Sequence, residues 1–410
     1  MIILIKSVCL EFLDYLYILD GVILICYGAF VMNSITASDE TMSPEKRRRG
    51  EGKGSSFFAV GRDVWETLWN VPTTNRLNLV LTYFTLLAGT GSDHRLTKWS
   101  ASACEQYLGI GKPRAKHAID ELIKSKLVKH TDKSTRLSPQ YELPELPLDA
   151  EPIFLPVQAL TGLKGENPMF RRVRETGDAM VLRMLVDLYG MVETDATFGI
   201  PISNLRNGGH ANAEAISRKV AQVGVHAVWA LEEGTYQNAG GDWTVRHASK
   251  SRKNGERDWS VFWERIGQLK QIGAIYYEPW LFEGAELDAE PLMPLDPAGL
   301  YQVSERDDGG RLTRLAHDTA YALVSEERPY VFENSGADYF VPLPLHHQPP
   351  ALRGVARLRV EADTPGRRLA WKRRRTLVEN WEKALSQLLS DAQQGHFDRP
   401  MQRGTKGGKR

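Results

Sequence analysis

The segment from residue 100 to residue 126 constrains the fold more than any other part of the chain. It reads as two short helices separated by the tripeptide Gly109-Ile110-Gly111. Gly109 suits a left-handed backbone conformation that other residues rarely adopt, so the first helix is expected to end there. Pro113 fits the first turn of the second helix, where its missing N–H costs no hydrogen bond. The second helix is expected to bury one stripe at helical spacing, formed by Ala115, Ala118, Ile119, Leu122 and Ile123.

The flanking segments complete a small module. Residues 74–89 are apolar most of the way round a helix, which predicts a central buried helix with Thr73 or Thr74 as its N-cap and Gly89 at its end. Residues 127–131 alternate, residues 132–135 favour a turn, and residues 136–143 return as a strand. The order predicted is therefore helix, short helix, glycine turn, helix and β-hairpin.

This order resembles the winged helix-turn-helix superfamily, on the residues Ser100 to Lys126 and the hairpin (the wing) that follows. The resemblance covers residues 74–143 and implies that the second short helix enters the major groove of DNA. Such a helix reads bases with side chains near its N-terminus, while hydroxyl and basic groups around it hold phosphates. The implied DNA-contacting residues are Ser100 and Ser102 before the turn, Lys112, Arg114, Lys116 and His117 on the second helix, and Lys129, Lys133 and Arg136 on the wing.

The second half of the chain repeats parts of this plan. Thr176 and Asp178 can cap an apolar helix over residues 179–190. Farther on, Ile266, Leu269, Ala274 and Ile275 fall at the spacing of Ile119, Leu122, Leu127 and Val128. We expect a second winged-helix-like domain over residues 165–285, with a hairpin that turns near Glu278-Pro279. It is interrupted by an insertion at about residues 204–256, in which residues 213–231 are expected to be helical.

Residues 286–350 are rich in proline, glycine and acidic residues, and they predict irregular structure. Residues 351–395 predict a strand and a long helix that begins at Pro365 after the N-cap Thr364 and ends at Gln393. Its apolar stripe is expected to contain Leu369, Leu377, Trp381, Leu385, Leu388 and Leu389. Residues 351–410 hold 15 Lys+Arg against six Asp+Glu. Arg368, Arg373 and Arg374 are therefore candidate phosphate contacts, with a solvated helix face as the alternative. Residues 396–410 predict a disordered tail.

The first 56 residues are expected to lie outside the folded part. Residues 1–32 are apolar, but charged residues interrupt them and the longest apolar run, residues 21–32, is too short to span a bilayer. This stretch is either a spurious extension before Met32 or Met42 or a loosely attached helix, and residues 33–56 read as a disordered basic linker. The three cysteines have neither disulfide nor metal-ligand spacing, which indicates a reducing cytoplasm.

The expected fold class is mainly α with small β-wings (α+β): tandem winged helix-turn-helix domains at residues 57–150 and 165–285, followed by a C-terminal basic helix. No phosphate loop, nucleophile elbow, dinucleotide fingerprint or metal-spaced cluster occurs in the sequence. We therefore expect no enzymatic activity, no catalytic residues, no cofactor and no metal.

Two such modules in one chain resemble plasmid and phage replication initiators. The resemblance implies sequence-specific binding of double-stranded DNA, a homodimer and contact with host replication proteins. Because the longest apolar run is too short to span a bilayer, we expect no association with a membrane. One alternative is a transcriptional regulator with the same DNA-reading head. A second alternative is an interaction protein whose winged helices contact other proteins.

Overall fold

The computed structural model describes residues 57–91, 94–146, 151–163, 165–192, 199–200, 217–232, 260–284, 289–296, 308–324, 330–333, 336–337 and 339–395. The apolar extension, the basic linker and the C-terminal tail lie outside these residues, as does most of the insertion. The described part contains helices and small antiparallel sheets, which confirms a mixed α and β fold.

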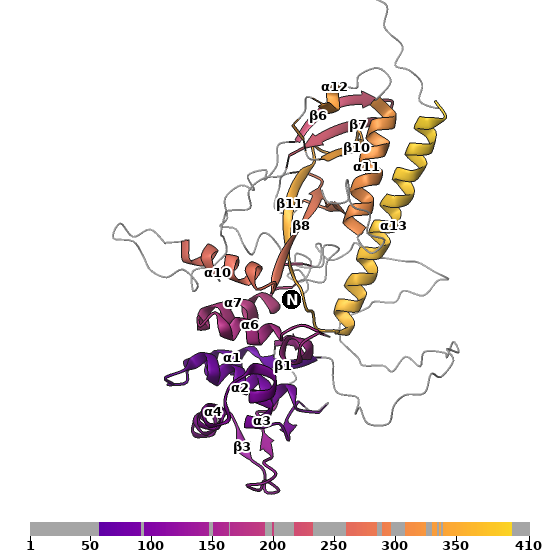
Figure 1. Ribbon diagram of the computed structural model, residues 1–410. Coiled ribbons are helices and arrows are strands. Elements are labelled where there is room, and N and C mark those ends of the chain that lie inside the picture. The colour runs from indigo at the N-terminus through magenta and orange to yellow at the C-terminus, as the bar shows by residue number, and fades with distance from the viewer. Residues whose placement is uncertain are drawn as a thin grey trace, which may run out of the picture. The chain divides into compact units, whose positions relative to one another are not determined.

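The N-terminal elements lie in the part of the chain coloured indigo to magenta in Figure 1. In chain order they are β1 (Phe57–Gly61), α1 (Arg62–Asn70), α2 (Arg76–Ala88), β2 (Leu96–Thr97), α3 (Ala101–Leu108), α4 (Lys112–Lys124), β3 (Lys129–His130), β4 (Tyr141–Glu142), β5 (Pro152–Pro156), α5 (Val157–Thr161), α6 (Met169–Glu175) and α7 (Ala179–Tyr189).

α2 is buried along nearly its whole length, as predicted. Every side chain from Leu77 to Leu87 is buried. The predicted cap is wrong: the N-cap is Asn75, whose side-chain oxygen accepts a hydrogen bond from the Asn78 N–H at 3.0 Å. Thr73 Oγ1 instead accepts from the Asn75 N–H and donates to the Glu121 carboxylate at 2.8 Å. The threonine hydroxyl thus ties the start of α2 to α4.

The glycine turn between α3 and α4 forms as the sequence predicts. Gly109 has a φ of 65°, Ile110 is fully buried, and Pro113 lies in the first turn of α4 after the N-cap Gly111. The predicted stripe of α4 faces the core, with only Ile123 half-buried. The short strands form a three-stranded antiparallel sheet in the order β2–β4–β3, in which Tyr141 pairs with both Thr97 and His130.

The C-terminal elements, coloured magenta to yellow in Figure 1, include two further three-stranded sheets, β10–β7–β6 and β11–β8–β9. In chain order the elements are β6 (Ser217–Val223), β7 (His226–Leu231), α10 (Ser260–Gln271), β8 (Ile275–Phe282), β9 (Pro291–Pro294), α11 (Asp308–Val324), α12 (Tyr330–Glu333), β10 (Tyr339–Pro344), β11 (Ala351–Leu358) and α13 (Pro365–Gln393).

Three sequence predictions are wrong in this region. Residues 217–231 form a β-hairpin that turns at Gly224 (φ 55°), because β7 pairs along its length with the distant β10. β8 runs unbroken through Pro279, which lies opposite Gly354, a residue without a side chain. The stretch 286–350, predicted to be irregular, contributes β9, α11, α12 and β10. In each case pairing with a distant segment overrides the local preference.

α13 begins and ends where the sequence predicts. The Thr364 hydroxyl accepts a hydrogen bond from the Arg367 N–H at 3.3 Å, and Pro365 occupies the first helical position. The apolar stripe differs from the prediction at Leu369, which is 51% exposed. The buried face holds two arginines among the apolar residues: Arg367, Ala370, Arg374, Val378, Leu385 and Leu388.

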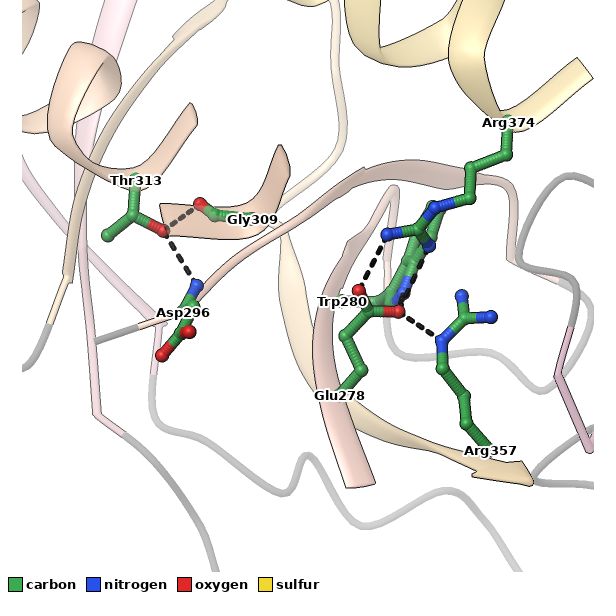
Figure 2. Close-up of polar contacts among 7 residues, drawn as sticks. All are labelled: Glu278, Trp280, Asp296, Gly309, Thr313, Arg357 and Arg374. Atoms are coloured by element: carbon green, nitrogen blue, oxygen red, sulfur yellow. Dashed lines mark hydrogen bonds and ion pairs between the residues drawn. The ribbon is translucent and has the colours of Figure 1, made fainter. Parts of the chain in front are cut away.

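α11 packs alongside α13 (Figure 1). The two helices share an apolar cluster with β9 and β10, and Arg311 on α11 forms an ion pair with Glu382 on α13 at 2.8 Å. The Thr313 hydroxyl on α11 donates to the Gly309 carbonyl at 2.8 Å and accepts from the Asp296 N–H at 2.7 Å (Figure 2). This hydroxyl fixes the start of α11 against the end of β9.

The two predicted domains share one hydrophobic core. The largest apolar cluster contains side chains of α2, α3 and α4 together with side chains of α6, α7 and α10. Polar contacts reinforce it: the Trp65 indole N–H donates to Asp187 at 3.0 Å, and Arg183 pairs with Glu66 at 2.7 Å. β1 also pairs with β5, which comes after the β3–β4 hairpin in the sequence. The described residues between 57 and 191 and α10 therefore form one packed unit.

The ends of α4 and α10 repeat the same backbone structure. After α4, the Leu127 N–H donates to the Leu122 carbonyl at 3.0 Å and Lys126 has a φ of 62°. After α10, the Ala274 N–H donates to the Leu269 carbonyl at 2.8 Å and Gly273 has a φ of 66°. Both are Schellman motifs that end a helix and direct the chain into a strand. The spacing noted in the sequence thus corresponds to a repeated helix-to-strand unit.

The repeated turn generates a stability prediction. Lys126 has a Cβ atom in a left-handed conformation, so Lys126→Gly is expected to raise the free energy of unfolding by up to about 1 kcal/mol. Gly273→Ala places a Cβ atom in the same conformation and is expected to lower it by about 1–2 kcal/mol. Urea denaturation of the full chain measures both changes.

Gly267→Ala provides the control for this pair. Gly267 lies inside α10, and an added methyl group would meet nothing within 4 Å. This variant is expected to stabilise the chain by about 0.5–1 kcal/mol, because alanine favours a helix interior. Changes of the same sign in Gly273→Ala and Gly267→Ala would contradict the conformational explanation.

Candidate nucleic-acid interface

α4 presents basic side chains opposite its buried stripe. Lys112, Arg114, Lys116 and His117 are all exposed. The Lys112 ammonium lies 3.4 Å from the Glu105 carboxylate, and His117 Nδ1 lies 3.8 Å from that of Glu121. Within the described part of the chain, Arg114 and Lys116 form no ion pair. Their charges are therefore available to an anionic ligand.

The N-terminus of α4 adds to this positive potential. Its N-cap Gly111 has no side chain with which to satisfy the first N–H groups, and the first turn contains no acidic residue. Unsatisfied N–H groups at a helix N-terminus carry a partial positive charge that attracts anions. The basic side chains and the helix dipole thus act in the same direction at this end of α4.

The start of α3 supplies hydroxyl groups. Ser100 is the N-cap and is half-buried, but its side chain makes no capping hydrogen bond. Ser102 is exposed in the first turn, and the exposed Lys98 precedes the helix. Hydroxyl and backbone N–H groups at a helix N-terminus are common phosphate contacts. The predicted phosphate-binding role of Ser100 and Ser102 is compatible with their positions.

The β3–β4 hairpin presents the third set of predicted residues. Lys129, Lys133 and Arg136 are exposed, and none of them forms an ion pair with another described residue. Hydrogen bonds order the loop that joins the two strands: the Thr131 N–H donates to the Gln140 carbonyl at 3.1 Å, and the Gln140 N–H donates to the Ser134 hydroxyl at 3.0 Å. The basic side chains therefore project from an ordered hairpin.

α6 brings two further arginines to the glycine turn. The Arg174 guanidinium donates to the Leu108 carbonyl at 3.1 Å, which satisfies the end of α3. The partly exposed Arg171 lies next to it, because a Cβ atom at Gly109 would be 3.8 Å from its Cζ atom. Sequence reasoning missed both residues. The cluster Arg171-Arg172-Val173-Arg174 is visible in the sequence, but only the fold places it beside the turn at Gly109, which is 62 residues before Arg171.

The three predicted phosphate contacts on α13 separate into different environments. Arg368 is exposed and lies 3.3 Å from the Asp363 carboxylate, and Arg373 is also exposed. Arg374 is only 5% exposed. Its guanidinium forms a bidentate pair with Glu278 on β8, with nitrogen-to-oxygen distances of 2.6 Å and 3.0 Å (Figure 2). The prediction that Arg374 contacts phosphate is therefore wrong, because its charge is buried and neutralised.

Glu278 is the centre of a buried polar cluster. Its carboxylate accepts hydrogen bonds from Arg374, from Arg357 on β11 and from the Trp280 indole at 2.7 Å (Figure 2). The Arg374 guanidinium also lies over the rings of Trp280 and Trp371, at 5.1 Å and 5.4 Å from their centroids. One carboxylate thus joins α13, β8 and β11.

Electrostatics keep this carboxylate ionised. Burial by itself would raise the pKa of Glu278, but the charges of Arg357 and Arg374 and the hydrogen bonds from Arg374 and Trp280 outweigh it and lower the pKa. Burial lowers the pKa of Arg357. The carboxylate and both guanidiniums are therefore mutually dependent, since removing one leaves a buried charge without compensation.

Removal of the Glu278 charge should destabilise the fold. Glu278→Gln leaves two guanidiniums buried without a counter-charge, and we expect the free energy of unfolding to fall by about 3–5 kcal/mol. Glu175→Gln, which removes the exposed partner of Arg171, is the control and is expected to cost at most about 1 kcal/mol. Urea denaturation measures both changes. Equal losses of unfolding free energy in the two variants would show that the buried cluster stabilises the fold no more than an exposed ion pair does.

The effect of Glu278→Gln should depend on pH. A glutamate in an unfolded chain has a pKa of about 4.3. Because the folded pKa of Glu278 is lower, its carboxylate stabilises the fold fully above about pH 4.3, and this contribution is lost as the pH falls through the folded value. The difference in unfolding free energy between wild type and variant is expected to stay constant between about pH 6 and 8 and to shrink below about pH 4. A constant difference down to the acid limit of folding would contradict this assignment.

Other kinds of site receive no support from the described residues. No group of three or more His, Cys, Asp or Glu side chains among them is arranged to hold a metal ion. Cys104 is buried in the core, and burial raises the pKa of its thiol. No helix among these residues has the length and apolar character needed to cross a membrane.

Comparisons with protein-family models, with curated proteins and with solved structures found no match. The exposed basic residues of α4, the start of α3 and the β3–β4 hairpin are the feature of the described residues that points to a ligand.

Proposed function

We propose that this protein binds double-stranded DNA through a winged helix-turn-helix, with α4 in the major groove and the β3–β4 hairpin as the wing. The observation that carries the proposal is the exposed face of α4. It holds Arg114 and Lys116 without acidic partners among the described residues, and its opposite face is buried. An α-helix fits the width of the major groove, and its N-terminal half meets the base edges.

The residues have different roles in this proposal. Arg114 and Lys116 project from the first turns of α4, where an arginine can bond to the O6 and N7 atoms of guanine. Ser100 and Ser102 hold a phosphate at the start of α3. Lys129, Lys133 and Arg136 neutralise phosphates along the wing, which strengthens binding to every sequence alike.

We further propose that the protein initiates replication of a plasmid, phage or integrative element, bound as a homodimer to repeated sites and in contact with host replication proteins. The support is architectural. The helix-to-strand unit of α4 recurs after α10, and both units are attached to one core. Such a core would hold a second half-site contact or a dimer contact at a constant position relative to α4.

Selection of bound sequences from a random DNA pool with the full chain tests the proposal. We expect one motif to be enriched at low salt. Copies of that motif in a repeated array near the gene would support replication initiation, whereas a single copy across a promoter would support transcriptional regulation instead. Failure to enrich any sequence at low salt would reject DNA binding and leave an interaction protein.

Two substitutions separate base reading from phosphate contact. Arg114→Ala is expected to cost about 1–3 kcal/mol of binding free energy and to relax the preference at one base position. Lys133→Ala is expected to weaken all sequences alike and to reduce the salt dependence of affinity by about one phosphate contact. Fluorescence anisotropy over a range of salt concentrations measures both effects.

Lys383→Ala, an exposed lysine in the second half of α13, is the control and is expected to leave affinity and preference unchanged. An Arg114→Ala variant with an unaltered base preference would show that α4 is not the recognition helix.

A further inference from the structure

The tip of the wing (residues 129–142) carries an apolar side chain with no intramolecular packing. Leu137 is 97% exposed, the highest value among the large hydrophobic side chains of the described residues. It follows Arg136 in the loop that joins β3 to β4. Isolated exposed leucines are common on protein surfaces, so exposure by itself indicates no function. Leu137 differs from such residues because its loop is held by hydrogen bonds and its neighbours are basic.

The backbone at the tip holds Leu137 in a defined turn. The Thr135 N–H donates to the Ser138 carbonyl at 3.1 Å, and the Ser138 N–H donates back to the Thr135 hydroxyl at 3.0 Å. Nearer the strands, His130 Nδ1 lies 3.1 Å from the Ser134 hydroxyl. The side chain between these bonds therefore projects from an ordered loop.

The charges around Leu137 select the kind of partner. Arg136 is adjacent, Lys133 lies on the same loop and Lys129 lies at its base, all exposed and without an ion pair in the described part of the chain. A polyanion with an apolar interior complements this combination. In duplex DNA the phosphates lie outside and the stacked bases lie within, so the basic groups can hold the backbone while the apolar tip reaches the base stack.

We propose that Leu137 inserts between two base pairs from the minor groove, unstacks that step and kinks the duplex, while Arg136 neutralises a phosphate beside it. This inference rests on the proposed DNA binding and adds an activity to it, namely local distortion of the duplex. Proteins that insert apolar wedges recover the cost of unstacking through the additional contacts that bent DNA makes. Flexible pyrimidine–purine steps are the cheapest to open, so one is expected beneath the wing tip.

The test uses the full chain and a duplex of about 30 base pairs that carries the selected site. Donor and acceptor dyes at its ends report bending, and 2-aminopurine at successive positions reports unstacking through a rise in fluorescence. Wild type is expected to bend the duplex by about 20–90° and to brighten 2-aminopurine at one step. Leu137→Ser is expected to keep the preference for the bases read by α4, to relax the preference for a pyrimidine–purine step beneath the wing tip and to lose both signals.

Two further variants complete the experiment. Leu137→Phe keeps an apolar wedge and is expected to keep both signals. Leu96→Ser alters another exposed leucine of the same module, 51% exposed on β2, and is also expected to keep both. Wild-type bending and brightening in Leu137→Ser would overturn the wedge while DNA binding stands. Absence of any DNA binding by wild type would overturn both proposals. A lower mass of Leu137→Ser in light scattering, with bending unchanged, would identify Leu137 as a protein contact and also overturn the wedge.

Discussion

The structure depends on a helix that has no solvent face. Every side chain of α2 from Leu77 to Leu87 is buried, and burial of each large apolar side chain is worth about 1.5–3 kcal/mol. Helices from both predicted domains cover it: α3 and α4 contact it from the first, and α6 and α7 contact it from the second. The two halves are therefore joined by the same apolar surface that folds the first of them.

This shared core matters for the proposed DNA contacts. Base reading requires that α4 be held at a constant position, and its buried stripe packs on α2 rather than on a mobile segment. The second half also reaches the glycine turn directly, because Arg174 satisfies the carbonyl of Leu108 and Arg171 lies beside Gly109. A structural change in the second half can thus alter the glycine turn through α6, even if the second half does not contact DNA.

Arginine serves two opposite purposes in this chain. On α4 and the β3–β4 hairpin it is exposed, so its charge is open to solvent. On α13, Arg374 lies on the buried face of the helix, unlike its exposed neighbours in the sequence, and Glu278 neutralises its charge. The buried face of α13 repeats at helical spacing and includes Arg367 and Arg374 along with apolar residues. The predicted stripe contained apolar residues alone, so Arg374 was wrongly predicted to contact phosphate.

Three features could be predicted because adjacent residues control them: the Gly109 turn, the buried stripe of α4 and the limits of α13. These depend on caps, on left-handed glycines and on helical periodicity, all of which act over a few residues. Three others could not be predicted: residues 217–231 form strands, β8 continues through Pro279, and Arg374 pairs with Glu278. Each of those outcomes depends on a partner far away in the chain, β10, β11 or a buried carboxylate, and pairing free energy outweighs local preference where such a partner is present.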